Sequence, residues 1–183
     1  MRGRFRSQIA AVGTALAVAA SITHSGAALN TYLTLTGEVQ GAIRGSVTLA
    51  GRLDTIEISE VHHLIHRPVI GGIVGAQTHE PFIFTKRIDR STVNLYRALN
   101  TGERLTAIFR YYEPDPSGTG AEIQHYTIEL RGALIVAIEP IKADTLDAQT
   151  SARPDTERVR MVYQEITVRY QVEDNEAEAL RAN

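Results

Sequence analysis

The chain has 183 residues, of which 43% are hydrophobic and 22% charged, and its formal net charge at pH 7 is −2. This length and composition predict one globular domain with a single core. The nearly balanced charge offers no basic field for nucleic acid or an acidic membrane surface, and the absence of cysteine excludes disulfides, thiolate nucleophiles and cysteine-type zinc sites.

The first 27 residues have the pattern of a secretory leader. Arg2, Arg4 and Arg6 precede an apolar run from Ile9 to Ile22, and small residues follow at 25–28. A basic start, a short apolar middle and a small-residue end together predict a cleaved leader. The apolar run is shorter than the roughly 20 residues of a membrane span, so we expect no stable membrane insertion. An N-terminal anchor or an untranslated upstream extension are the alternatives.

After the leader the pattern is dominated by strands. Period-2 alternation in Tyr32–Thr36 predicts a half-buried strand, and the glycines of Gly37–Gly41 predict a turn after it. The same signals predict further strands at Asp54–Val61, Pro81–Lys86, Leu105–Tyr112, Ile123–Leu130, Ala133–Ile141 and Val159–Val172. The glycine-rich segment 67–80 is expected to be a long exposed loop.

One helix is expected after Asp89 or Ser91, because either side chain can accept an otherwise unpaired amide hydrogen. Gly102 supplies a left-handed stop. Three apolar residues share one face at helical spacing: Val93, Tyr96 and Leu99. Six or so strands around one helix predict a mainly β fold, a small barrel or sandwich of antiparallel strands with one flanking α-helix.

No linker divides the chain after the leader. We therefore expect a leader at residues 1–27, one β-barrel domain at residues 28–172 and an acidic C-terminal tail at residues 173–183. The tail is alanine-rich and is expected to be frayed or a short helix.

Four segments, taken together, resemble the haemolysin-coregulated protein (Hcp) family of type VI secretion. Pro81–Leu105, PFIFTKRIDRSTVNLYRALNTGERL, is similar to that family's strand ending in Phe-Thr-Lys and the capped helix after it. The other three resemble its opening, central and closing strands: Tyr32–Gly41, His125–Ile138 and Val162–Gln171. The resemblance runs in family order from about Leu29 to Val172. The chain departs from the family pattern in two places. It has the leader, and it has Val93 where many family members have proline.

The resemblance implies a structural protein without a cofactor, not an enzyme. Family members assemble into hexameric rings that stack into a tube, with a contractile sheath, a spike protein and effectors carried in the lumen as partners. It implies a secreted protein, or one that stays cytoplasmic until export if the leader is not cleaved. The alternative is an extracellular or phage-tail-tube-like polymer exported by the leader.

The resemblance also gives a role to the glycine-rich segment, because the equivalent family loop reaches toward the next ring. Loops of this length in a compact domain are usually functional or disordered. We expect a ring-stacking contact made by Arg67, Pro68, Gly71, Gly72, Gly75, Gln77 and His79.

A histidine cluster is the main rival chemical site. His62, His63 and His66, with His79 beyond the loop, could in principle bind zinc or copper. Adjacent strand residues point to opposite faces, however, and no carboxylate at a diagnostic spacing completes the set. A polar rim or lumen lining is the preferred interpretation, and an enzyme that uses these histidines is the alternative. No Gly-x-Ser-x-Gly nucleophile motif is present.

Overall fold

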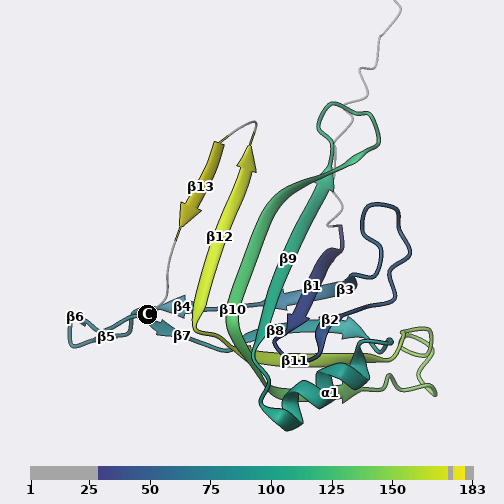
Figure 1. Cartoon of the computed structure of the whole chain (residues 1–183), viewed down its shortest axis with the longest axis horizontal. Coiled ribbons are helices and arrows are strands. Elements are labelled where there is room, and N and C mark those ends of the chain that lie inside the picture. The colour runs from purple at the N-terminus through teal and green to yellow at the C-terminus, as the bar shows by residue number, and fades with distance from the viewer. Residues whose placement is uncertain (1–28, 173–174, 180–183) are drawn as a thin grey trace, which may run out of the picture.

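The computed structural model describes residues 29–172 and 175–179, so the predicted leader lies outside the described residues. Six antiparallel strands close a barrel (Figure 1). In spatial order they are β1 (Thr31–Gly37), β3 (Ile56–His62), β8 (Phe82–Arg87), β11 (Thr156–Val162), β10 (Glu122–Ile141) and β9 (Leu105–Pro114), which pairs again with β1. The short β2 (Gly41–Ile43) pairs with the end of β1, and the predicted turn lies between them. The mainly β fold with one helix is confirmed.

The 20-residue strand β10 belongs to two parts of the molecule. Its first half pairs with β9 and with β12 (Glu165–Val172), and its second half pairs with β11. The ladder to β9 shifts register between Leu130 and Ala133, where Gly132 has a φ of +58°. We call β12, β13 (Asn175–Ala179) and the first half of β10 the wing, because they project beyond the barrel (Figure 1).

Three predictions about these strands were wrong. The segments expected as two strands form the single strand β10, because Gly132 is absorbed as an irregularity in the ladder. The segment expected as one closing strand is divided into β11 and β12 by a short irregularity at residues 163–164, and both parts run antiparallel to β10 in the same direction. In the tail, residues 175–179 form a strand paired with β12 instead of a helix or a frayed end.

The alternating residues of the barrel strands fill one core. Leu33, Leu35 and Phe109 are fully or almost fully buried, which confirms the alternation predicted for β1. The Phe109 ring lies 4.7 Å from that of Phe82 and 5.5 Å from that of Phe84, measured between centroids. These tilted and edge-on contacts are the favourable geometries for aromatic pairs, and they fix β8 against β9.

The helix α1 (Thr92–Thr101) ends as predicted, at Gly102 with a φ of +64°. The predicted apolar face was right only for Leu99, which packs against the core, because Val93 is 68% and Tyr96 37% exposed. The buried residues are Leu95 and Ala98 on another face. Since α1 packs on β10, the small Ala98 side chain permits a close approach that Tyr96 could not make.

A buried ion-pair network fixes the chain where β8 passes into the helix. The fully buried Lys86 donates from Nζ to Glu157 Oε1 at 2.6 Å and to Asp89 Oδ1 at 2.9 Å. The predicted cap at Ser91 makes no side-chain bond to the helix; its amide and hydroxyl donate back to Asp89 Oδ1. Burial opposes ionisation of Asp89, but hydrogen bonds from Ser91 and Lys86 outweigh it and lower the pKa of Asp89.

Candidate functional site

The segment between β3 and β8 forms a narrow two-stranded arm. β4 (Ile65–His66) pairs with β7 (Thr78–His79), and β5 (Val69–Ile70) pairs with β6 (Ile73–Val74). The prediction of a long exposed loop over residues 67–80 was therefore wrong about the loop, because short strands pair within the segment, whereas the segment is mostly exposed as expected. Figure 1 shows the arm projecting from one side of the barrel, with β5 and β6 farthest out.

The tip of the arm turns on two glycines. Gly71 and Gly72 have φ values of +57° and +81°, and a two-residue hairpin turn with positive φ at both positions matches the twist of its strands. Below the turn, the Gly75 amide donates to the Pro68 carbonyl at 2.8 Å, and a Cβ at Gly75 would lie 3.0 Å from Pro68 Cγ. A larger residue at position 75 would push the two strands apart.

Four aliphatic side chains flank this turn and face solvent. They are 59–77% exposed: Val69, Ile70, Ile73 and Val74. We call these residues the arm tip. The residues predicted for the contact include the glycines but not these neighbours, although the Val-Ile-Gly-Gly-Ile-Val order is a hairpin signal. A tip with four exposed aliphatic residues is typical of a contact surface for another protein.

The other residues predicted for the contact occupy different positions on the arm. Arg67 and Gln77 are exposed along its length. His79 lies at the base and is directed toward the barrel, where its Nδ1 is 2.6 Å from the hydroxyl oxygen of Tyr163. His79 is thus part of the attachment of the arm and not of its tip.

Tyr163 joins the arm to the end of β3. Its hydroxyl oxygen also lies 2.8 Å from Nε2 of His63, so the phenol donates to one imidazole and accepts from the other. Burial, together with the nearby His79, lowers the pKa of His63, and burial raises the pKa of Tyr163 to about 12. At neutral pH the His63 imidazole and the Tyr163 phenol are therefore uncharged. Nothing in the sequence pattern pointed to Tyr163, because it becomes a neighbour of the histidines only when the barrel closes.

The remaining histidines of the cluster do not converge with this pair. His62 points to the outer face of the barrel, and His66 Nδ1 is buried without a hydrogen-bond partner in the described part of the chain. Across residues 29–172 and 175–179, no three His, Cys, Asp or Glu side chains are grouped so that they could hold a metal ion.

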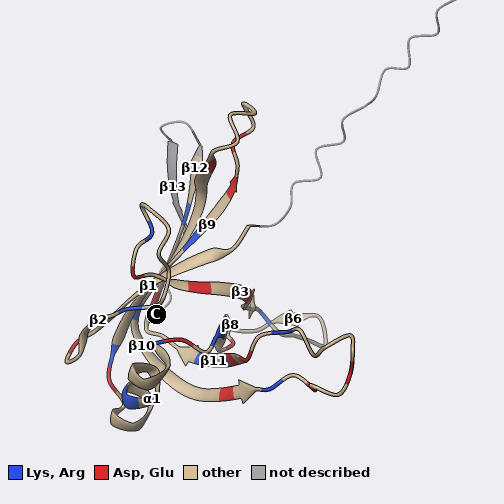
Figure 2. Cartoon of the chain, turned by 90° about the vertical axis from the view of Figure 1, so that its right-hand side faces the viewer, with Lys and Arg blue, Asp and Glu red and all other residues tan. Residues whose placement is uncertain are grey.

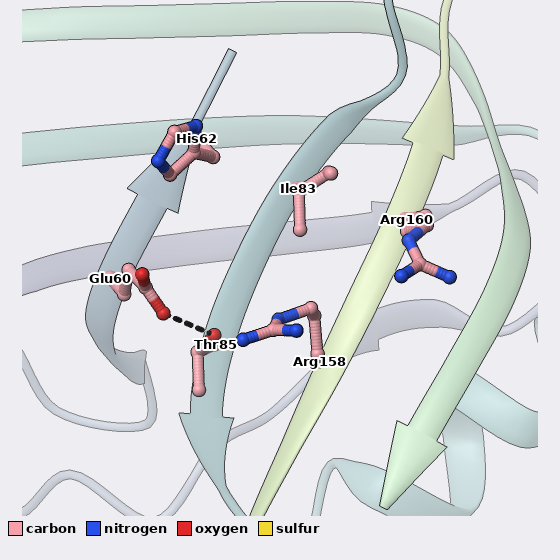
Figure 3. A pocket seen from close by; sticks show the side chains of 6 residues that line it. All are labelled: Glu60, His62, Ile83, Thr85, Arg158 and Arg160. Atoms are coloured by element: carbon pink, nitrogen blue, oxygen red, sulfur yellow. Dashed lines mark hydrogen bonds between the residues drawn. The ribbon is translucent and has the colours of Figure 1, made fainter.

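The outer face of β3, β8 and β11 carries a shallow polar pocket of about 280 Å³. Figure 3 shows Glu60 and His62 on one side and Arg158 and Arg160 on the other. Glu60 accepts a hydrogen bond from the Thr85 hydroxyl at 3.0 Å. Figure 2 shows basic and acidic residues interspersed along the strands, a distribution that suits contact with a protein surface of mixed charge.

A second projection lies between β1 and β2. Glu103 Oε1 accepts from the amides of Val39 and Gln40, both at 2.7 Å, and Oε2 accepts from Gln40 Nε2 at 2.6 Å. One carboxylate therefore fixes the turn against the end of α1. The turn presents Val39, which is 87% exposed.

Comparison with known proteins gives consistent results. The family described as "Type VI secretion system effector, Hcp" matches residues 32–170. The chain is 29% identical over 154 residues to the major exported protein of Pseudomonas aeruginosa, covering 77% of this chain and 88% of that protein. A mutant of Hcp1 from the E. coli EAEC 042 pathovar has 29% identity and a TM-score of 0.73, covering 83% of this chain and 98% of its own. The secreted protein Hcp3 from Pseudomonas aeruginosa, at 22% identity and a TM-score of 0.64, shares the fold over 84% of this chain and 99% of its own.

Proposed function

Since this chain belongs to the Hcp family of type VI secretion proteins, we propose that it is a ring-forming subunit of the secretion inner tube, exported and carrying effectors in its lumen. The observation that carries this proposal is the family match over residues 32–170, which includes nearly all of the closed barrel and of β12. The family is one of structural tube proteins and not of enzymes.

The topology supports assembly through contacts outside the barrel. Each barrel strand has a hydrogen-bonded neighbour on both sides, so the ladders of the barrel are internally satisfied. The wing and the arm, by contrast, project from it. A head-to-tail contact between two different surfaces generates a ring when the rotation closes. We propose six subunits per ring, as the family implies.

The arm is the proposed stacking element. Each arm-tip side chain gains about 1–2 kcal/mol when it is buried, by the usual value for aliphatic surface, before the entropy of association is subtracted. Six arms acting together between two rings would multiply this modest contact. The shape and edges of the arm come from Arg67, Pro68, Gly71, Gly72, Gly75 and Gln77. His79 holds its base.

Export is proposed along with assembly. Similarity to the major exported protein of Pseudomonas aeruginosa supports secretion, and the spike, sheath and effectors are proposed as partners from the family. Within residues 29–172 and 175–179, the structure contains no helix that is long and apolar enough to cross a membrane. The alternative function, an extracellular polymer exported by the leader, would not need the secretion apparatus.

The test is to express the full chain, purify it and examine it by size-exclusion chromatography and negative-stain electron microscopy. We expect six-membered rings and stacked tubes. The double variant Ile70→Asp/Ile73→Asp should keep the rings and lose the stacks, because buried carboxylates at the arm tip are costly. The matched control is Leu146→Asp, a charge introduced at an aliphatic residue that is 95% exposed in the connection between β10 and β11.

The outcomes are separable. A monomer at high concentration contradicts the ring, whereas stacked tubes of wild-type length from the arm variant contradict only the stacking role. The extracellular-polymer alternative is tested in cells that lack the contractile sheath. Protein that still reaches the medium of those cells would favour that alternative.

A further inference from the structure

A second pocket, of about 410 Å³, lies on the outer face of β1 and β9, on different strands from the pocket of Figure 3. Its floor includes Thr34 and Arg110, which are on neighbouring strands, and its wall includes Tyr32 and Tyr112. The loop between β2 and β3 folds over one side and contributes Arg52. A volume of this size is in the range of pockets that bind small molecules.

Arg52 is held in place on one side of this pocket. Its guanidinium carbon lies 3.5 Å from the centroid of the Tyr112 ring and 4.7 Å from that of Tyr32. Nη1 lies 2.5 Å from Glu122 Oε2, and the side chain is only 10% exposed. Stacking and the ion pair together fix the Arg52 side chain, so the wall is formed before any ligand arrives. The charge of Arg52 is balanced by Glu122.

Arg110 differs from Arg52 because its charge is not balanced. It makes one hydrogen bond, from Nη1 to Thr34 Oγ1 at 2.7 Å. In the described part of the chain no carboxylate lies within ion-pair distance of it. Its cross-strand neighbours are Tyr32 on β1 and Thr127 on β10, and both are uncharged. The guanidinium is half-buried and keeps most of its N–H donors for another acceptor.

These contacts define what the pocket can recognise. A partly desolvated arginine is stabilised by an anion that accepts two parallel N–H bonds. Thr34 Oγ already accepts from Arg110, which leaves its own O–H free to donate toward the same anion. With Arg52 paired to Glu122, the pocket has about one net positive charge, supplied by Arg110.

We propose that this pocket binds the oxyanion group of a small molecule, a carboxylate or a phosphate, with Arg110 as the bidentate donor and Thr34 as the second donor. Arg52, stacked on the two tyrosines, forms the wall that positions the rest of the ligand. The site depends on the geometry of a single subunit and is independent of the proposed tube function.

The experiment is an NMR titration of the full chain, labelled with ¹⁵N, with sodium phosphate and separately with sodium acetate. Sodium chloride at matched ionic strength measures general screening. We expect saturable shifts of the Arg110 Nε–H and of the Thr34 amide, with dissociation constants in the millimolar range and no saturation by chloride. Saturation by both anions assigns the site to oxyanions in general, and saturation by phosphate alone assigns it to phosphoryl groups. Both results support the proposal.

Two variants and a control make the titration decisive. Arg110→Gln should weaken binding at least tenfold, and Thr34→Val, which keeps the arginine, should weaken it severalfold. Arg158→Gln removes an arginine from the pocket of Figure 3 and should leave the dissociation constant of the Arg110 pocket unchanged. The proposal is overturned if chloride produces the same shifts, or if Arg110→Gln, with its fold verified by its spectrum, binds as tightly as the parent protein.

Discussion

Replacing Lys86 with methionine tests whether the buried ion-pair network anchors α1 to the barrel. Methionine has a similar length and can occupy the same space, so the change removes a charge without opening a large cavity. Lys86 Nζ is within hydrogen-bond distance of the carboxylates of Glu157 and Asp89, the Arg87 carbonyl and the Thr92 hydroxyl. Lys86 is 0% and Glu157 1% exposed, so water cannot replace these bonds.

The expected loss is large because one charge would remain buried without its partner. Removing one member of a buried ion pair typically costs about 3–5 kcal/mol. For a domain of this size each kcal/mol lowers the melting temperature by roughly 2–4 °C, so the expected decrease is about 10 °C.

Urea unfolding followed by circular dichroism measures this loss. Lys142→Met is the matched control, because Lys142 pairs with Asp155 at 2.9 Å but is 69% exposed, and an exposed pair contributes about 1 kcal/mol at most. In a double-mutant cycle, Lys86→Met and Glu157→Gln should be coupled by more than about 1 kcal/mol. A loss for Lys86→Met no greater than that for Lys142→Met would refute the argument that burial makes this ion pair important.

Three further predictions concern the projections. Tyr163→Phe removes two hydrogen bonds at the base of the arm, each contributing about 1 kcal/mol, so hydrogen exchange of residues 64–80 should accelerate roughly tenfold or more; unchanged exchange there would contradict the attachment. The folded-state pKa of His63 is lowered, so the amide hydrogens of the arm should be fully protected from exchange above the ordinary histidine pKa of about 6.5 and should lose that protection as the pH falls below it. His63→Asn should flatten this pH dependence. Glu103→Ala should destabilise the protein by about 2–3 kcal/mol in urea unfolding and broaden the Val39 and Gln40 amide resonances; sharp, unshifted amides would show that the turn does not need the carboxylate.

Local signals predicted the parts of the fold that depend on local chemistry. The stop of α1 at Gly102 follows from one residue that adopts positive φ readily. The face of α1 did not follow from spacing, because apolar residues occur on more than one side and the contact with β10 selects Leu95 and Ala98. The hairpin in the arm could not be predicted from its glycines, because glycines indicate a loop and a tight turn equally well.

The candidate sites depend on contacts between distant parts of the chain. Tyr163 meets His63 across 100 residues, and Arg52 reaches Glu122 across 70. No local pattern encodes such pairs, since they form only when the barrel closes and the β2–β3 loop folds over its outer face. The sequence pattern therefore indicates the arm as a region and His79 at its base, but not the aliphatic tip, Tyr163 or the pocket around Arg110.

The length of β10 has a mechanical consequence. One unbroken backbone runs from the wing into the barrel wall and is hydrogen-bonded to neighbours along both halves, with Gly132 where the two meet. A pull on the wing is carried as tension along this strand and as shear across its ladders, and shear loads many hydrogen bonds at once. Paired ladders on both sides of Gly132 oppose a swing of the wing against the barrel. Load applied to the wing is therefore passed along β10 into the barrel wall.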